Sequence, residues 1–145
     1  MRRASEITHV GEMIQVGRRG VGSARPADLA AAEERGVHFF GAGDIHRGGI
    51  EQVLHSVPLG GSVFITVDVD GLDPSFAPGT GTPEIGGLTI WQGIEIIRGC
   101  RGLPIVGCDL VEVAPIYDAS GNTSLVAANL LYEMLCILPG VKYRE

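Results

Sequence analysis

The chain has 145 residues, of which 45% are hydrophobic, and a formal net charge of −6. This length is enough for one domain with a real core, and the composition is that of a folded globular protein. Positive residues are scattered and pair locally only at residues 2–3 and 18–19, so we expect no nucleic-acid surface. No apolar run approaches the length that crosses a membrane, which excludes a membrane-embedded class.

Strands and helices are predicted to alternate from the amino terminus onward. The first residues look like the tail of a helix. The elements expected after it are, in chain order, a strand over 13–17, a helix over 26–36, a strand over 37–43, a helix over 44–58, a strand over 62–70, a helix over 90–100, a strand over 103–113 and a helix over 124–138. Asp44 and Thr89 are the predicted N-caps of the second and third of these helices.

Strand 62–70 is apolar on both faces, which is typical of a central strand in a parallel sheet. Alternating strands and helices with short connections indicate an α/β fold with a parallel sheet. Ligands in such sheets bind beyond the carboxyl ends of the strands. Asp68 and Asp70 lie at one such end, and Glu112 lies at the end of the next strand.

The amino-terminal residues and the cysteines indicate the cellular location of the protein. Residues 1–17 lack the continuous apolar segment of a signal peptide. The cysteines, Cys100, Cys108 and Cys136, are odd in number and lack CxxC spacing, which favours small buried thiols in a reducing environment. These features predict a cytoplasmic protein.

The acidic segment D-x-D-x-x-D-P, from Asp68 to Pro74, indicates a metal site. Residues two apart in a strand point the same way, so Asp68 and Asp70 are expected to present two carboxylates to one point. Two such carboxylates repel each other unless a cation lies between them, and oxygen ligands favour Mg, Ca or Mn. The alternative is that these acids only cap the following turn.

The segment DVDGLDPSFAPGTGTPEIGGLT resembles the signature of the ureohydrolases, the family of arginases and agmatinases. The form APGTGTP followed by GGLT is closer to agmatinases and guanidinobutyrases, and VGCDLVEVAPIYDASGNTSLVAANLLYEMLC is similar to the family's closing strand and helix. The resemblance implies a three-layer α/β/α sandwich with a mainly parallel sheet. It covers residues 1–145 as a single, N-terminally truncated domain, similar to the C-terminal half of the family fold.

The resemblance also implies an activity and roles for four residues. The family uses two Mn ions and a bridging hydroxide to hydrolyse linear guanidino compounds to urea and an amine. Asp68 resembles the carboxylate that bridges both metals, and Asp70 resembles a ligand of one, so both would be catalytic through the metal centre. Glu112 matches the acid that pairs with the substrate guanidinium, and Thr82 matches a residue of the substrate pocket. Agmatine, giving putrescine, is the expected substrate, guanidinobutyrate is its nearest competitor, and a homo-oligomer is expected.

The sequence departs from the family pattern at the other metal ligands. The GGDH-type and D-A-H-x-D motifs that supply them do not occur in these residues. The chain is therefore expected not to complete the Mn site by itself, and the isolated polypeptide is expected to be inactive. The alternative function is a catalytically inactive fragment that acts as an assembly or binding module.

Three other interpretations concern individual segments. FITVDVDG also resembles the first motif of haloacid-dehalogenase phosphatases, but the downstream Lys of that family has no counterpart, because Lys142 lies in the tail. Asp44 and His46 imitate a D-x-H metal motif, and we interpret Asp44 as a helix cap instead. The apolar residues of the last helix are predicted to be core; they are Leu125, Leu130, Leu131, Met134 and Leu135.

Overall fold

The computed structural model describes residues 2–20 and 25–142. Its strands form two parallel pairs, β1 (Met13–Arg18) with β2 (Val37–Gly41) and β3 (Val63–Asp68) with β4 (Ile105–Val111). The helices are α1 (Arg2–Ser5), α2 (Pro26–Glu33), α3 (Ala42–Gly48), α4 (Glu51–Ser56), α5 (Ile90–Gly99) and α6 (Asn122–Cys136), with short 3₁₀ helices η1 (Val69–Gly71) and η2 (Pro115–Tyr117).

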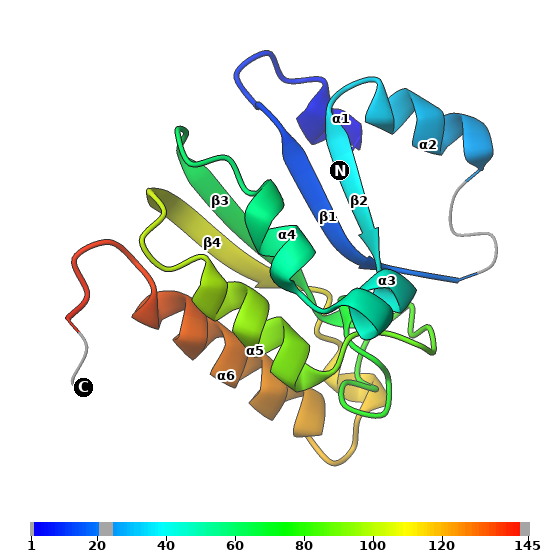
Figure 1. Cartoon of the computed structure of the whole chain (residues 1–145). Helices are drawn as coiled ribbons and strands as arrows, with labels where there is room; N and C mark the ends of the chain where they lie inside the picture. The colour runs from blue at the N-terminus through cyan, green and yellow to red at the C-terminus, as the bar shows by residue number, and fades with distance from the viewer. Residues whose placement is uncertain (1, 21–24, 143–145) are drawn as a thin grey trace.

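The strands of both pairs point toward the same end of the molecule (Figure 1). In the register of β3 and β4, Asp68 lies opposite Val111, so the acidic ends of the two strands are neighbours. Within the described residues no hydrogen-bonded ladder joins the two pairs. The α/β class with parallel strands is therefore confirmed, as two short sheets.

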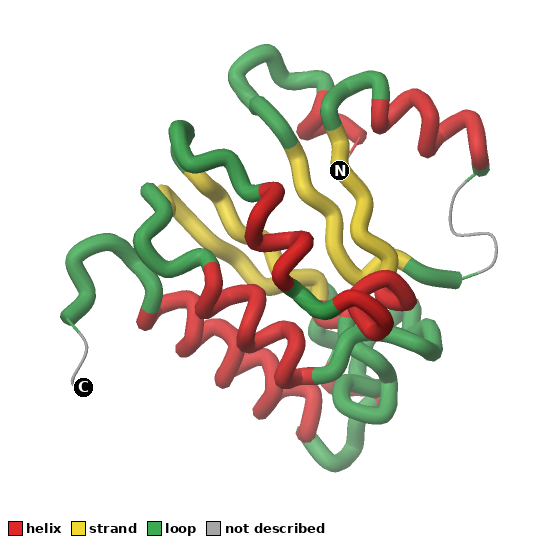
Figure 2. Tube along the Cα trace, in the orientation of Figure 1, coloured by secondary structure: helices red, strands yellow, loops and turns green. Residues whose placement is uncertain are grey.

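Helices α5 and α6 pack together over one face of the β3–β4 pair (Figure 2). The core there joins Ile65 and Val67 of β3 to the fully buried Leu130 and Met134 of α6. The opposite face of β3 is open, because Phe64 retains 59% of its accessible surface. The prediction that this is a central strand is wrong within the described residues, because β3 pairs there only with β4 and Phe64 is exposed.

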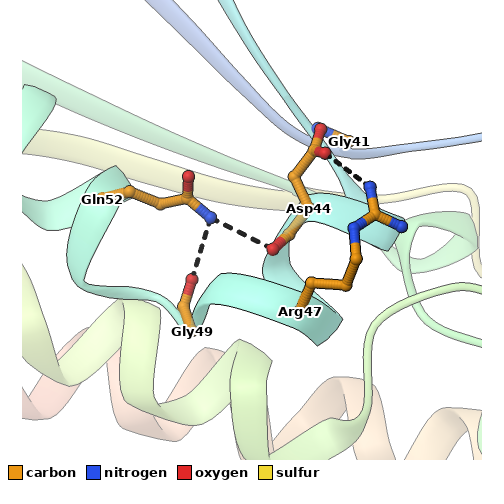
Figure 3. Close-up of polar contacts among 5 residues, drawn as sticks. All are labelled: Gly41, Asp44, Arg47, Gly49 and Gln52. Atoms are coloured by element: carbon orange, nitrogen blue, oxygen red, sulfur yellow. Dashed lines mark hydrogen bonds and ion pairs between the residues drawn. The ribbon is translucent and has the colours of Figure 1, made fainter.

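The segment predicted as one helix from Asp44 to Pro58 is two helices, α3 and α4, so that prediction is wrong. Gly49 has φ +80°, a left-handed conformation that an α-helix cannot continue through. The helix also begins earlier than predicted, at Ala42, so Asp44 lies in its first turn and is not the N-cap residue. Its carboxylate instead accepts a hydrogen bond from the Gly41 backbone N–H at 3.2 Å (Figure 3).

Helix α5 begins at Ile90, and Thr89 is its N-cap, as predicted. The Gln92 backbone N–H donates to the Thr89 hydroxyl at 3.1 Å, and the Gln92 side-chain oxygen accepts from the Thr89 backbone N–H at 3.0 Å. This reciprocal pair is a capping box, which satisfies two backbone donors that the first turn would leave without partners.

The prediction that the apolar residues of the last helix are all core is wrong for three of them. Leu130 and Met134 are buried, whereas Leu125 and Leu135 retain 62% and 55% of their accessible surface, and Leu131 is also exposed. The reason is helical geometry, because residues that do not share the 3.6-residue period of the buried face point away from the sheet. None of the described helices is long and apolar enough to cross a membrane.

Candidate functional site

The first two acids of the acidic segment lie where β3 ends. Asp68 is the last strand residue, and Asp70 lies in the 3₁₀ turn η1 that follows. The Asp68 carboxylate accepts a hydrogen bond from the Asp70 backbone N–H at 3.2 Å, so Asp68 does cap this turn. The turn, rather than strand alternation, therefore brings the two carboxylates together.

Asp68 is in an environment that resists its negative charge. Partial burial raises the pKa of Asp68 to about 6, the neighbouring charges of Asp70 and Glu112 add to the rise, and the hydrogen bond from the Asp70 backbone opposes it. Like charges near a carboxylate disfavour its ionised form. A bound divalent cation would remove that repulsion.

Thr82 comes to the same place from the long loop that follows η1. Its hydroxyl donates a hydrogen bond to the Asp70 carboxylate at 2.9 Å. The contact joins residues twelve apart in the sequence. The structure therefore brings together Asp70 and Thr82, two residues that the sequence predicted for one site.

Glu112 follows the last residue of β4, directly beyond the partner of Asp68 in the ladder. Its φ is +66°, and it is the one non-glycine residue with positive φ in the described chain. A left-handed conformation at a residue other than Gly, Asn or Asp is unfavourable, and such strain concentrates at functional sites. The conformation of Glu112 is thus independent support for a role at this sheet end.

The third acid of the segment, Asp73, has a different environment. Its carboxylate accepts hydrogen bonds from the hydroxyl and backbone N–H of Ser75 and from the backbone N–H groups of Gly86 and Gly87. These donors, with Ser75 contributing most, lower the pKa of Asp73 to about 2. Asp73 therefore closes the loop on itself. Only the Asp-Pro-Ser turn pattern could have indicated this role in advance.

The imitation D-x-H motif in α3 is held by other contacts. Asp44 pairs with Arg47 at 2.8 Å (Figure 3). His46 lies 2.9 Å through Nε2 from the Gly87 carbonyl oxygen and 3.4 Å through Nδ1 from the Gln92 amide nitrogen. Because a carbonyl only accepts, Nε2 carries the proton, and both ring nitrogens have protein partners. His46 thus fastens α3 to the loop before α5, a contact that the sequence did not reveal.

The donor set at the end of β3 fits a divalent metal in part. Carboxylate oxygens are suitable ligands for Mn²⁺, and the raised pKa of Asp68 indicates an environment that a cation would stabilise. Across residues 2–20 and 25–142, however, no three His, Cys, Asp or Glu side chains are grouped so that they could hold a metal ion. Asp68 and Asp70 can therefore supply part of a coordination shell.

The comparison with known proteins places this geometry in a family. Residues 1–136 match the model of the arginase family, so the chain belongs to that family. It is 49% identical over 148 aligned residues to a guanidinobutyrase of Pseudomonas aeruginosa, covering 99% of this chain and 46% of that protein. It is 76% identical over 82 residues to a mitochondrial agmatinase of Gallus gallus, covering 57% of this chain and 24% of that protein.

Among solved structures, the agmatine ureohydrolase of Thermoplasma volcanium superposes with a TM-score of 0.78 at 35% identity. The match covers 92% of this chain and 44% of that one. The chain thus spans less than half the length of each of these three relatives. The arginase-like α/β fold predicted from the acidic segment is confirmed.

Proposed function

We propose that this chain contributes to the hydrolysis of a linear guanidino compound to urea and an amine. The observation that carries the proposal is the convergence of Asp68, Asp70, Thr82 and Glu112 at the carboxyl ends of β3 and β4. The names of the relatives support the same class of substrate, since each refers to a guanidino compound or to agmatine.

The four residues have separate roles in this proposal. Asp68 and Asp70 would hold Mn²⁺. Bound there, the metal would lower the pKa of a water molecule, which would supply a hydroxide nucleophile for the guanidinium carbon. Glu112 binds the guanidinium, because a carboxylate accepts two parallel N–H bonds from that planar group. Thr82, whose hydroxyl is held by the Asp70 carboxylate, helps to position the reacting group.

We propose agmatine as the substrate and putrescine as the amine product, with guanidinobutyrate as the competing choice. The names of the relatives divide between these two compounds. Both present the same guanidinium to Glu112 and differ only at the far end of the carbon chain. A direct comparison of the two compounds therefore decides the substrate.

The alternative is a module for assembly without catalysis. The open face of β3, with Phe64 exposed, and the exposed leucines of α6 favour it, because large exposed apolar surfaces mark protein–protein contacts. A homo-oligomer fits either function. A cytoplasmic location stays a prediction, and the Gallus gallus relative is named mitochondrial.

Urea release with added Mn²⁺ tests the proposal. The 145-residue chain is compared with the same chain fused to the part of the Pseudomonas guanidinobutyrase that it does not cover. We expect urea from the fusion, with agmatine or guanidinobutyrate, and little from the chain alone, because Asp68 and Asp70 supply only part of a metal shell.

The substitution Glu112→Gln should abolish most of the urea release by the fusion. Glu34→Gln, which changes an exposed acid at the end of α2, is the matched control and should leave it unchanged. A folded fusion that releases no urea from either compound would contradict the proposed function, and rapid release by the short chain would contradict the need for further ligands.

A further inference from the structure

Arg19 follows the last residue of β1 and reaches the loop formed by residues 71–89. Its Nη2 donates to the carbonyl oxygens of Glu84 at 2.6 Å and Leu72 at 3.1 Å. Its Nε donates to the same Glu84 oxygen at 3.2 Å, and Nη1 donates to the Gly17 carbonyl at 3.3 Å. One guanidinium therefore joins the strand end to two separate segments of this loop.

The two loop residues whose carbonyls bind Arg19 each follow a residue of the candidate site by two positions. Leu72 is two residues after Asp70, and Glu84 is two residues after Thr82. The hydrogen bond between Thr82 and Asp70 and the bridge through Arg19 thus connect the same two segments at neighbouring points. Because Arg19 binds backbone oxygens, it fixes how far apart these segments lie.

The end of β1, from which Arg19 extends, packs closely against the loop. Gly17 has φ +87°, and a Cβ there would lie 3.3 Å from the Gly71 carbonyl oxygen and 3.2 Å from the Leu88 side chain. The strand end and the loop are therefore in close contact. A planar guanidinium with several fixed donors can hold carbonyls of two segments together, which the single ammonium of a lysine does less well.

We propose that Arg19 is a positioning residue that keeps Thr82 against Asp70 in the guanidino site. The inference rests on the proposed function for the meaning of that site, while the contacts of Arg19 stand without it. The hydrogen bonds of Arg19 to this loop go to backbone carbonyl oxygens. Arg19 acts through the backbone at Leu72 and Glu84, and it determines where the Thr82 hydroxyl lies.

Nuclear magnetic resonance of the 145-residue chain tests this role. The readouts are the order parameter of the Thr82 methyl group and its broadening by added Mn²⁺, compared with the broadening of the Asp68 and Asp70 amides. In Arg19→Met we expect the ratio of molecules with the Thr82 hydroxyl bonded to Asp70 to molecules with that hydrogen bond broken to fall about tenfold. This is the effect of losing about 1.4 kcal/mol of hydrogen bonding. The Asp68 and Asp70 amides should still broaden as in the wild type.

Arg19→Lys should restore part of the Thr82 order, and it is also the variant to use if Arg19→Met does not fold. Arg18→Met is the matched control, because the neighbouring Arg18 lies over the Phe39 ring at 5.6 Å and should leave Thr82 unchanged. Unchanged Thr82 order in both folded Arg19 variants, or equal loosening in the Arg18 control, would overturn the proposal. Failure of Mn²⁺ to broaden the Asp68 and Asp70 amides of the fusion described above would count against the proposed function. The Thr82 order parameter of the 145-residue chain would still decide the role of Arg19.

Discussion

Asp68 and Asp73 are five residues apart and have opposite electrostatic environments. Partial burial and two neighbouring carboxylates raise the pKa of Asp68, whereas four donors lower the pKa of Asp73. A carboxylate whose lone pairs are all used by the protein cannot also serve a metal. Asp68 therefore remains able to bind a ligand, whereas Asp73 serves to hold the loop in shape.

The roles proposed for Asp68 and Glu112 predict different losses. Asp68→Ala should remove Mn²⁺ binding, because it deletes a carboxylate of the metal shell. Glu112→Gln should leave Mn²⁺ binding in place and weaken guanidino binding, because it removes the charge that pairs with the substrate. Calorimetric titration of each fusion variant, first with Mn²⁺ and then with agmatine, measures both effects. Equal loss of Mn²⁺ from the two variants would contradict the separate roles.

Caps at the helix starts determine where α5 and α6 begin, and so how the site loops meet them. Asp118 accepts hydrogen bonds from Ser120 and from the Thr123 backbone N–H, which lies in the first turn of α6. The Thr123 hydroxyl accepts from the Gly79 backbone N–H at 2.8 Å. The first turn of α6 is therefore tied to the loop that carries Thr82.

The cap at Thr89 can be tested by truncation. Thr89→Ala should lower the free energy of unfolding by about 1 kcal/mol, because the Gln92 N–H loses its acceptor. Thr8→Ala, in the exposed loop before β1, is the control and should have little effect. Denaturant unfolding of the chain gives both values. A loss at Thr89 no greater than at Thr8 would show that the cap contributes nothing.

Asp118 predicts how stability depends on pH. Hydrogen bonds from Ser120 and Thr123 lower the pKa of Asp118 to about 2, below its usual value of about 3.9. Its contribution to stability is therefore complete above the usual pKa and is lost as the pH falls from about 4 to about 2. The difference in unfolding free energy between wild type and Asp118→Ala should shrink over that interval in denaturant unfolding. A difference that stays constant from pH 5 to pH 2 would contradict the assignment.

The arrangement of the layers leaves the β3–β4 pair covered on one face. Parallel sheets are normally buried on both faces, and here Phe64 and Val106 retain 59% and 68% of their accessible surface. Such a surface lowers its free energy when it is removed from water, by about 25 cal/mol for each Å² of apolar area. Association with another copy of the chain would achieve this.

Self-association is accordingly expected to depend on this face. Val106→Thr keeps a β-branched residue in the strand but adds a hydroxyl, and it should shift the sedimentation of the chain toward the monomer. Leu59→Ser removes an isolated leucine that is 86% exposed and serves as the control. Sedimentation velocity over a range of concentrations measures the shift. Equal behaviour of the two variants would exclude the open face as the contact.

The sequence alone determined the alternation of strands and helices, the cap at Thr89 and the family of the acidic segment. These features depend on local patterns, namely apolar periodicity, turn residues and short motifs, which a short stretch of chain contains in full. The fold class followed from them. The single domain over residues 1–145 and the roles of Asp68, Asp70, Thr82 and Glu112 stay predictions.

Only the tertiary structure decided the contacts that join distant segments. Arg19 and Glu84 are 65 residues apart, and His46 and Gly87 are 41 apart, so no local pattern could pair them. The break between α3 and α4 and the exposed leucines of α6 also depended on what packs nearby. The sequence therefore determined which side chains reach the strand ends, and long-range packing decided which of them are held in place there and by what.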